Sequence, residues 1–162
     1  MIDKLEHIAE QTLNKYLDSP ARIVATSLGG VIWVELLSRH PEWWDRCQSL
    51  VLLGSPLGGA HLARMLTPLG LGLGLSMVKH LAQNRRSLAE QITAKIPTLV
   101  VAGNIIGGVD GMVSVQSTQL QYAQFIRLDG VDHWALRYHP RVITVIQEFW
   151  SFWSQPQEIF GQ

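Results

Sequence analysis

Apolar residues follow two different periods along this chain, and the two periods alternate. Near the N-terminus they recur at helical spacing between Asp, Lys, Glu and Gln, which predicts an amphipathic helix that ends at Ser19-Pro20. A short β-branched strand at 22–25 follows, and then a helix over 28–39. The apolar positions of the first helix are Ile2, Leu5, Ile8, Ala9, Leu13, Tyr16 and Leu17. Three apolar residues of the second can face a sheet: Val31, Val34 and Leu37.

Two later runs are apolar at every position rather than at alternate ones. They cover 49–53 and 97–102, and Gly-containing turns close both of them. Uninterrupted apolar runs of this length are typical of parallel strands that are buried on both faces. Residues 124–128 predict a fourth strand, with a short helix over 115–123 before it.

Pro140 opens a final predicted helix. Its apolar stripe consists of Val142, Val145, Ile146, Phe149, Trp150 and Trp153. Two further tryptophans, Trp43 and Trp44, follow Pro41, and we expect them to be partly exposed.

Strands that alternate with helices imply right-handed crossovers and a parallel sheet covered by helices. We therefore predict one α/β domain over 1–162, a three-layer α/β/α sandwich with about four parallel strands. The segment 57–94 is too long for a simple crossover, and glycines space its apolar middle at 68–76. Two interpretations stay open: a buried irregular connection, and a lid or cap that forms an acyl-binding wall.

Composition narrows the functional classes. Hydrophobic residues make up 47% of the 162 residues and charged residues 16%, with a formal net charge of zero. This balance argues against an electrostatic binder of nucleic acid or acidic lipid. The single cysteine, Cys47, excludes an intrachain disulfide, and no uncharged apolar run reaches the ~18–20 residues of a membrane span. Because the N-terminus also lacks a signal-peptide pattern, we expect a cytoplasmic protein without a membrane span.

Ser27 stands where the strand at 22–25 turns into the helix at 28–39. Such a turn lifts a hydroxyl clear of the sheet and beside a helix N-terminus, where negative charge is favoured. A serine nucleophile also needs a base, and the base needs an orienting group. Asp110 follows the third predicted strand and His133 the fourth. Loops after parallel strands gather at the carboxyl edge of a sheet, so we expect Ser27, Asp110 and His133 on one rim.

Other titratable residues are alternatives for these roles. Asp129 and Asp132 are rival acids, although Asp132 adjoins His133 and side chains of adjacent loop residues usually diverge. His61 lines a pocket or starts a helix at the surface. We expect no metal site, because His61, His133 and Asp110 lack the close spacing of zinc motifs, and no cofactor. The remaining histidines are assigned to the surface or to helix ends: His7, His40, His80 and His139.

Four short motifs occur in order, each at the end of a predicted strand. They are Ala25-Thr-Ser-Leu-Gly29, Leu53-Gly-Ser-Pro-Leu-Gly-Gly59, Asp110-Gly-Met-Val113 and Asp132-His133. In these motifs the chain resembles the α/β-hydrolase superfamily and, within it, bacterial esterases and lipases. The resemblance implies a serine hydrolase acting on carboxylic esters, with Ser27 as nucleophile, Asp110 as acid and His133 as base. It also implies that the backbone N–H of Leu28 is an oxyanion donor. The apolar composition of 57–78 suggests an apolar acyl group.

The chain departs from this family pattern in two ways. The elbow begins with Ala25 where the family usually has glycine. The strands that normally precede the first helix, and the early loop that supplies a second oxyanion donor, have no counterpart. We therefore expect a truncated α/β-hydrolase fold whose Ser27 strand is an edge open to self-association. The alternative function is a catalytically impaired fragment that acts as an assembly or binding module.

Overall fold

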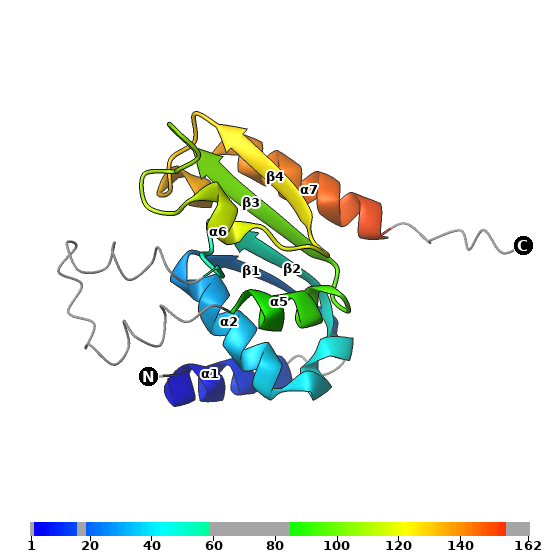
Figure 1. Cartoon of the computed structure of the whole chain (residues 1–162). Coiled ribbons are helices and arrows are strands. Elements are labelled where there is room, and N and C mark those ends of the chain that lie inside the picture. Colours follow the sequence, from blue (N-terminus) through cyan, green and yellow to red (C-terminus); the bar gives the residue numbers. More distant parts are fainter. Residues whose placement is uncertain (1, 16–18, 59–84, 155–162) are drawn as a thin grey trace, which may run out of the picture.

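The structure of the chain is a computed structural model, which describes residues 2–15, 19–58 and 85–154. Helices and strands alternate along most of this chain (Figure 1). In order they are α1 (Ile2–Lys15), β1 (Ala21–Thr26), α2 (Leu28–Arg39), η1 (Pro41–Arg46), β2 (Cys47–Leu53), α5 (Arg86–Thr93), β3 (Thr98–Asn104), α6 (Val115–Thr118), β4 (Gln124–Asp129), η2 (Ala135–Arg137) and α7 (Pro140–Ser154).

The four described strands form one parallel sheet in the order β1-β2-β3-β4. Val24 pairs with Val51, Leu52 with Val100, and Val101 with Ile126. The predicted α/β architecture with about four parallel strands is therefore confirmed. Because every strand runs the same way, the residues that follow the strands meet at the carboxyl edge of the sheet.

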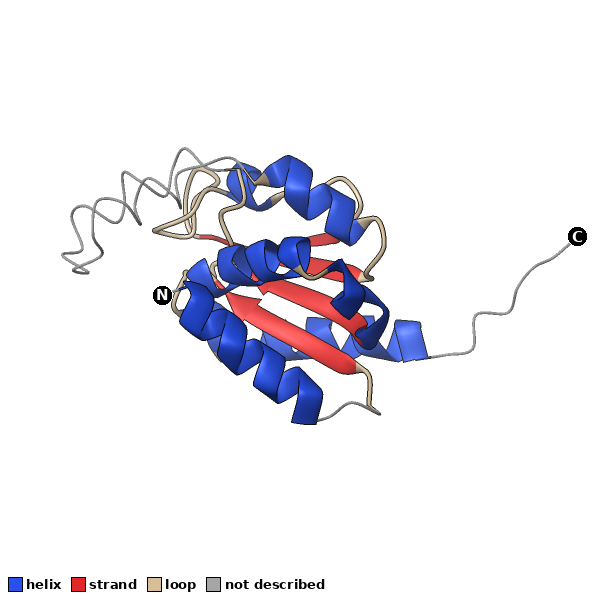
Figure 2. Ribbon diagram, turned by 90° about the horizontal axis from the view of Figure 1, so that it is seen from below, coloured by secondary structure: helices blue, strands red, loops and turns tan. Residues whose placement is uncertain are grey.

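Helices cover both faces of the sheet, with α1, α2 and α5 on one face and α7 on the other (Figures 1 and 2). Alternate residues of β2 point to opposite faces, so Leu50 and Leu52 pack with α2 and α5, whereas Val51 and Leu53 pack with α7. Every one of these four side chains is almost completely buried. This two-sided burial explains why β2 and β3 are apolar at consecutive positions.

Strand β1 lies at one edge of the described sheet. Its side chains alternate between buried (Ile23, Ala25) and exposed (Arg22, Val24), and Val24 is 46% exposed. Arg22 donates from Nε to Gln48 Oε1 across 2.7 Å, and its guanidinium stacks on Trp150. The expected edge position of the Ser27 strand is thus found, and self-association through it stays a prediction.

Three local predictions were wrong. The helix predicted over 115–123 ends at Thr118, because the hydroxyls of Ser117 and Thr118 bond to carbonyls within the same turn and compete with helix continuation. Trp43 is buried rather than partly exposed and stacks on His40 with ring centroids 4.0 Å apart. Trp153, expected in the core stripe of α7, is 41% exposed.

Only the two ends of the predicted 57–94 connection fall within the described residues; 59–84 and His61 lie outside them. The described ends are joined, since the Arg85 N–H donates to the Leu57 carbonyl across 2.9 Å. Residues 86–93 form the amphipathic helix α5, which was not predicted. Of the described helices, none has the length and apolar character that crossing a membrane requires.

The Arg85 end is fixed to α2 by an ion pair. Arg85 Nε lies 3.2 Å from Glu35 Oε2, and Arg39 bonds the other oxygen of the same carboxylate. Burial raises the pKa of Glu35, but the hydrogen bonds and charges of Arg85 and Arg39 outweigh burial and leave this pKa below its ordinary value.

Candidate active site

Ser27 occupies a strained turn between β1 and α2. It has φ 53° and ψ −122°, and it is the only non-glycine residue with positive φ in the described part of the chain. Such a conformation costs on the order of 1–3 kcal/mol and persists only where the surroundings enforce it. Two backbone hydrogen bonds hold the turn in this conformation. Ser27 N–H donates to Leu53 O at the end of β2 across 2.8 Å, and Gly30 N–H donates to Ser27 O across 3.1 Å. The Ser27 side chain does not cap α2.

Small residues let α2 pass close to the sheet just after this turn. A β-carbon built on Gly30 would lie 2.1 Å from Ser55 Oγ, so a larger residue does not fit there. A β-carbon on Gly29 would be 3.9 Å from Ala25 Cβ, which is an ordinary contact. Alanine at position 25 is therefore compatible with this packing. The N-terminus of α2, where Leu28 is the first helical residue, thus lies directly beside the end of β1.

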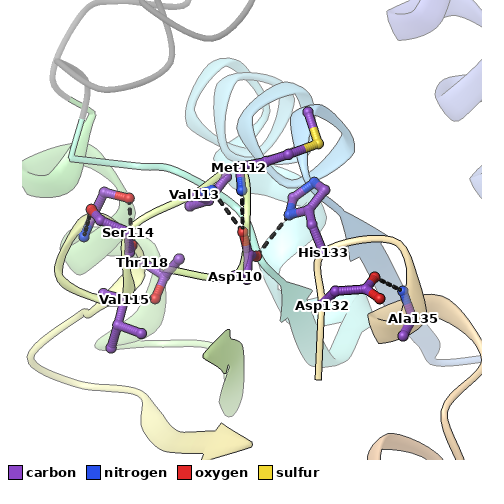
Figure 3. Close-up of polar contacts among 10 residues, drawn as sticks. Asp110, Met112, Val113, Ser114, Val115, Thr118, Asp132, His133 and Ala135 are labelled. Carbon is purple, nitrogen blue, oxygen red and sulfur yellow. Dashed lines mark hydrogen bonds and ion pairs between the residues drawn. The ribbon is translucent and has the colours of Figure 1, made fainter. Parts of the chain in front are cut away.

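Asp110 and His133 form a buried pair, and Figure 3 shows its contacts. Asp110 Oδ2 lies 2.8 Å from His133 Nδ1, and the two residues are only 2% and 4% exposed. The backbone joins them a second time, because His133 N–H donates to Asp110 O across 2.9 Å. The imidazole can thus have only a narrow range of orientations relative to the carboxylate.

The other oxygen of Asp110 is held by its own loop. Oδ1 accepts the N–H groups of Met112 (2.9 Å) and Val113 (2.6 Å), as Figure 3 shows. Two amide donors and the imidazole therefore surround this carboxylate and fix its position. In the tautomer whose Nδ1–H donates to Asp110, Nε2 is the ring nitrogen that can accept a proton.

Gly54, at the end of β2, links this pair to the serine turn. A β-carbon on Gly54 would lie 3.1 Å from His133 Nδ1 and 3.2 Å from Asp110 Oδ2. The preceding residue, Leu53, is the one whose carbonyl accepts the Ser27 N–H. Sequence analysis missed this role of Gly54, although its position directly after an apolar strand was the available signal.

The structure thus places Ser27, Asp110 and His133 at the carboxyl edge of the sheet, after β1, β3 and β4 respectively. It joins Asp110 to His133 by a hydrogen bond. Among the described contacts there is none between the Ser27 hydroxyl and His133. Hydrogen bonds of a catalytic site are often long before substrate binds, so this geometry is compatible with a serine–histidine pair.

The two rival acids have other partners. Asp132 Oδ1 accepts the Ala135 N–H across 2.8 Å and, in Figure 3, points away from the imidazole. Asp129 is exposed and bonds to Asn104, which together with Arg127 holds the pKa of Asp129 below its usual value. Neither carboxylate orients His133 in this structure.

Apolar side chains lie beside the pair. The Met112 side chain extends toward the His133 imidazole (Figure 3), and sequence analysis did not single it out. Trp134 follows His133 directly, meets its ring edge-on at 6.0 Å and is 54% exposed. Within the described residues, no three His, Cys, Asp or Glu side chains gather in a group that could hold a metal ion.

Comparison with solved structures finds the same fold in several proteins. The chain is similar to Bacillus licheniformis lipase BlEst2 in its mature form, with a TM-score of 0.69, 20% identity and coverage of 92% of this chain and 71% of that one. It is also similar to a putative non-heme bromoperoxidase, BpoC, from Mycobacterium tuberculosis H37Rv, with a TM-score of 0.71, 14% identity, and coverage of 96% and 75%.

A third similar structure is the N-acyl homoserine lactonase AidH, as an E219G mutant complexed with N-hexanoyl homoserine. Here the TM-score is 0.64, the identity is 15%, and coverage is 96% of this chain and 72% of that one. No family model and no curated protein matches the chain. At these identities the likeness establishes the fold alone.

Proposed function

We propose that this chain, which has the α/β-hydrolase fold, is a serine hydrolase that acts on carboxylic esters. One observation carries the proposal: the buried His133–Asp110 pair lies at the same sheet edge as a serine held at positive φ. Neither feature is needed for a simple turn. Together they supply what a serine nucleophile requires, namely a base, an orienting carboxylate and a hydroxyl held at a sharp turn.

In the proposed mechanism Ser27 Oγ attacks the ester carbonyl carbon. His133 Nε2 takes the serine proton and then returns it to the leaving alcohol, which yields the acyl-enzyme. Water then attacks the acyl group by the same route, and Ser27 is released with its proton. Asp110 keeps the imidazole in the required tautomer and stabilises its charged form, while its own orientation is fixed by Met112 and Val113.

The backbone N–H of Leu28 is the proposed oxyanion donor, because it lies at the N-terminus of α2 directly after the nucleophile. No second donor is assigned. The loss of one donor typically costs ~10²–10³ in turnover. We therefore expect the chain by itself to turn over slowly, and its acylation to be easier to detect than its steady-state rate.

The proposed substrate carries an apolar group next to the ester. Met112 and the exposed ring of Trp134 flank His133, and both present apolar surface at the reacting edge. Two of the similar structures are named a lipase and an N-acyl homoserine lactonase. These names support an ester as the substrate class and leave the particular ester open.

Covalent labelling tests the proposal directly. A fluorophosphonate probe should label the wild-type chain at Ser27 and should not label Ser27→Ala. Ser87→Ala, a change at an exposed serine of α5, is the matched control and should label like the wild type. Hydrolysis of p-nitrophenyl butyrate should fall to background in Ser27→Ala only. Equal labelling of Ser27→Ala, or no labelling of the wild type, would refute the nucleophile.

A second candidate function is an assembly module without appreciable turnover. The position of β1 at an edge of the described sheet favours it, because an edge strand presents backbone groups that a further strand can pair with. This candidate predicts concentration-dependent association in sedimentation velocity and no fluorophosphonate labelling. Robust ester turnover by a monomer would exclude it.

A further inference from the structure

A separate cavity opens at the opposite edge of the sheet from Ser27. Its volume is about 280 Å³, and it lies where β3 and β4 begin, against the last turns of α7. Thr98 and Gln124, the first residues of these two strands, both line it. Since Ser27, Asp110 and His133 follow strands rather than precede them, this cavity is no part of the candidate active site.

Aromatic side chains form the walls of this cavity. Tyr122, Phe152 and Trp153 are 56%, 58% and 41% exposed, and Phe149 is buried behind them. The rings of Phe152 and Trp153 are nearly perpendicular, with centroids 5.5 Å apart, and Phe149 meets Trp153 edge-on at 6.4 Å. The cavity thus offers ring faces and ring edges together, which are the two surfaces on which another aromatic ring packs.

These exposed rings extend beyond the hydrophobic core. The apolar stripe of α7 packs on the sheet through Val142 and Phe149, whereas Phe152 and Trp153 are exposed and line the cavity. Core packing therefore does not account for the last two rings. Adjacent exposed aromatic side chains on a cavity wall are a feature of ligand sites, which combine apolar walls with a few polar groups.

The charged side chain in the cavity lining determines which ligand charge the cavity favours. Lys95, in the loop between α5 and β3, is the only charged residue that lines the cavity, and no carboxylate does. Among the described residues no ion pair to Lys95 is found. A ligand with one negative charge therefore complements the cavity, whereas a cation would meet a lysine of like charge.

We propose that this cavity binds a small aromatic carboxylate. The ring packs against Phe152 and Trp153, and the carboxylate faces the ammonium group of Lys95. The volume of about 280 Å³ lies just below the usual range for drug-sized ligands, so the ligand has one or two fused rings. Binding at this edge does not depend on the proposed hydrolase function.

Titration of the full chain with 1-naphthoate, followed by ligand-observed NMR and calorimetry, tests this inference. A ligand of this size should bind with a dissociation constant of roughly 1 mM. The neutral isostere 1-naphthamide should bind about two- to fivefold more weakly, as should 1-naphthoate to Lys95→Gln, which is the effect of one exposed ion pair. Phe152→Ala should weaken 1-naphthoate about two- to tenfold, because it removes a ring contact.

The control is Tyr138→Ala, which removes an exposed ring outside the cavity and should leave 1-naphthoate binding unchanged. Circular dichroism and thermal melts verify that each variant is folded. Three results would overturn the proposal: no binding to the wild type, binding to Phe152→Ala and Lys95→Gln that is as tight as to the wild type, or weakening by Tyr138→Ala. None of these results bears on whether Ser27 is a nucleophile, because fluorophosphonate labelling measures that separately.

Discussion

Gly54 lies directly against His133: a β-carbon built on this glycine would be 3.1 Å from the imidazole Nδ1. The same added atom would be 2.8 Å from Leu136 Cδ1 and 3.2 Å from Asp110 Oδ2. Since Gly54 also has φ +56°, both its backbone conformation and its lack of a side chain are required at this point.

Gly54→Ala should therefore lower the free energy of unfolding by about 2–4 kcal/mol, the sum of left-handed strain and overpacking. Urea denaturation measures this. Gly107→Ala is the matched control, because Gly107 has φ +61° but no atom within 4 Å of an added β-carbon. It should cost only the strain of about 1–2 kcal/mol. Equal losses in the two variants would show that contact with the His133–Asp110 pair is unimportant.

Asp110→Asn should reduce ester turnover by up to about 10⁴-fold, which is to the background rate for a slow enzyme, while the fold is kept. The asparagine carbonyl can accept the N–H groups of Met112 and Val113 in place of Oδ1, but its amide group then faces His133 Nδ1 as a donor. This places the imidazole proton on Nε2, where the proposed base must accept one. Steady-state kinetics with p-nitrophenyl butyrate measures the loss.

The control for this change is Asp132→Asn. Asp132 is exposed and accepts the Ala135 N–H rather than contacting the imidazole. Ester turnover by Asp132→Asn should therefore stay within about twofold of the wild type. A larger effect at Asp132 than at Asp110 would reverse the assignment of the acid.

Glu35→Gln should destabilise the fold at neutral pH by about 1 kcal/mol, because Arg85 and Arg39 lose their shared carboxylate and solvent screens part of the pair. The pKa of Glu35 is lowered in the folded chain, so its contribution is present above the ordinary value of 4.5 and is lost as the pH falls below it.

The difference in stability between the wild type and Glu35→Gln should therefore shrink between about pH 5 and pH 3. Urea denaturation across this range measures it. Glu148→Gln, at an exposed position on α7, should show neither the loss nor its pH dependence. A difference that grows toward low pH would contradict the sign of the shift.

Cys47 should resist alkylation in the native chain. Burial raises the pKa of its thiol to about 11, although the nearby charge of Arg46 opposes the rise, so little thiolate exists at neutral pH. Iodoacetamide at pH 8 should modify Cys47 only after urea is added, as mass spectrometry would show. Rapid and complete modification of the native chain would contradict this prediction, and Cys47→Ser controls for reaction elsewhere.

The same shift predicts a change in stability at alkaline pH. Because the folded pKa is higher than the ordinary value of 9.0, the unfolded chain loses its thiol proton first as the pH rises. The contribution of Cys47 to stability should be complete below pH 9.0 and should decline toward pH 11. Cys47→Ser should lack this decline.

Much of the sheet could be predicted from the sequence because its signals are local. The runs that became β2 and β3 are apolar at consecutive positions, and the structure buries them on both faces as expected. Parallel strands then bring the residues after them to one edge, which is why Asp110 and His133 could be expected together across a separation of 23 residues.

Other features depend on tertiary contacts that no local pattern contains. Helix α5 is only eight residues long, and it packs on the sheet through Ala89 and Ile92. The end of α6 at Thr118 depends on which carbonyls accept hydrogen bonds from the hydroxyls of Ser117 and Thr118. The role of Gly54 depends on side chains from the segments after β3 and β4 that meet beside it. The functional roles of Ser27, Asp110, His133 and Leu28 remain predictions that labelling and kinetics can test.

The hydrogen bond between Leu57 O and Arg85 N holds together the two described ends of the long connection between β2 and α5. The two residues are anchored independently, Leu57 by its burial and Arg85 by Glu35 on α2. Closing a loop of half the length changes the entropic cost by only about 0.6 kcal/mol. The entropic cost of joining Leu57 to Arg85 therefore depends only weakly on the number of residues between them.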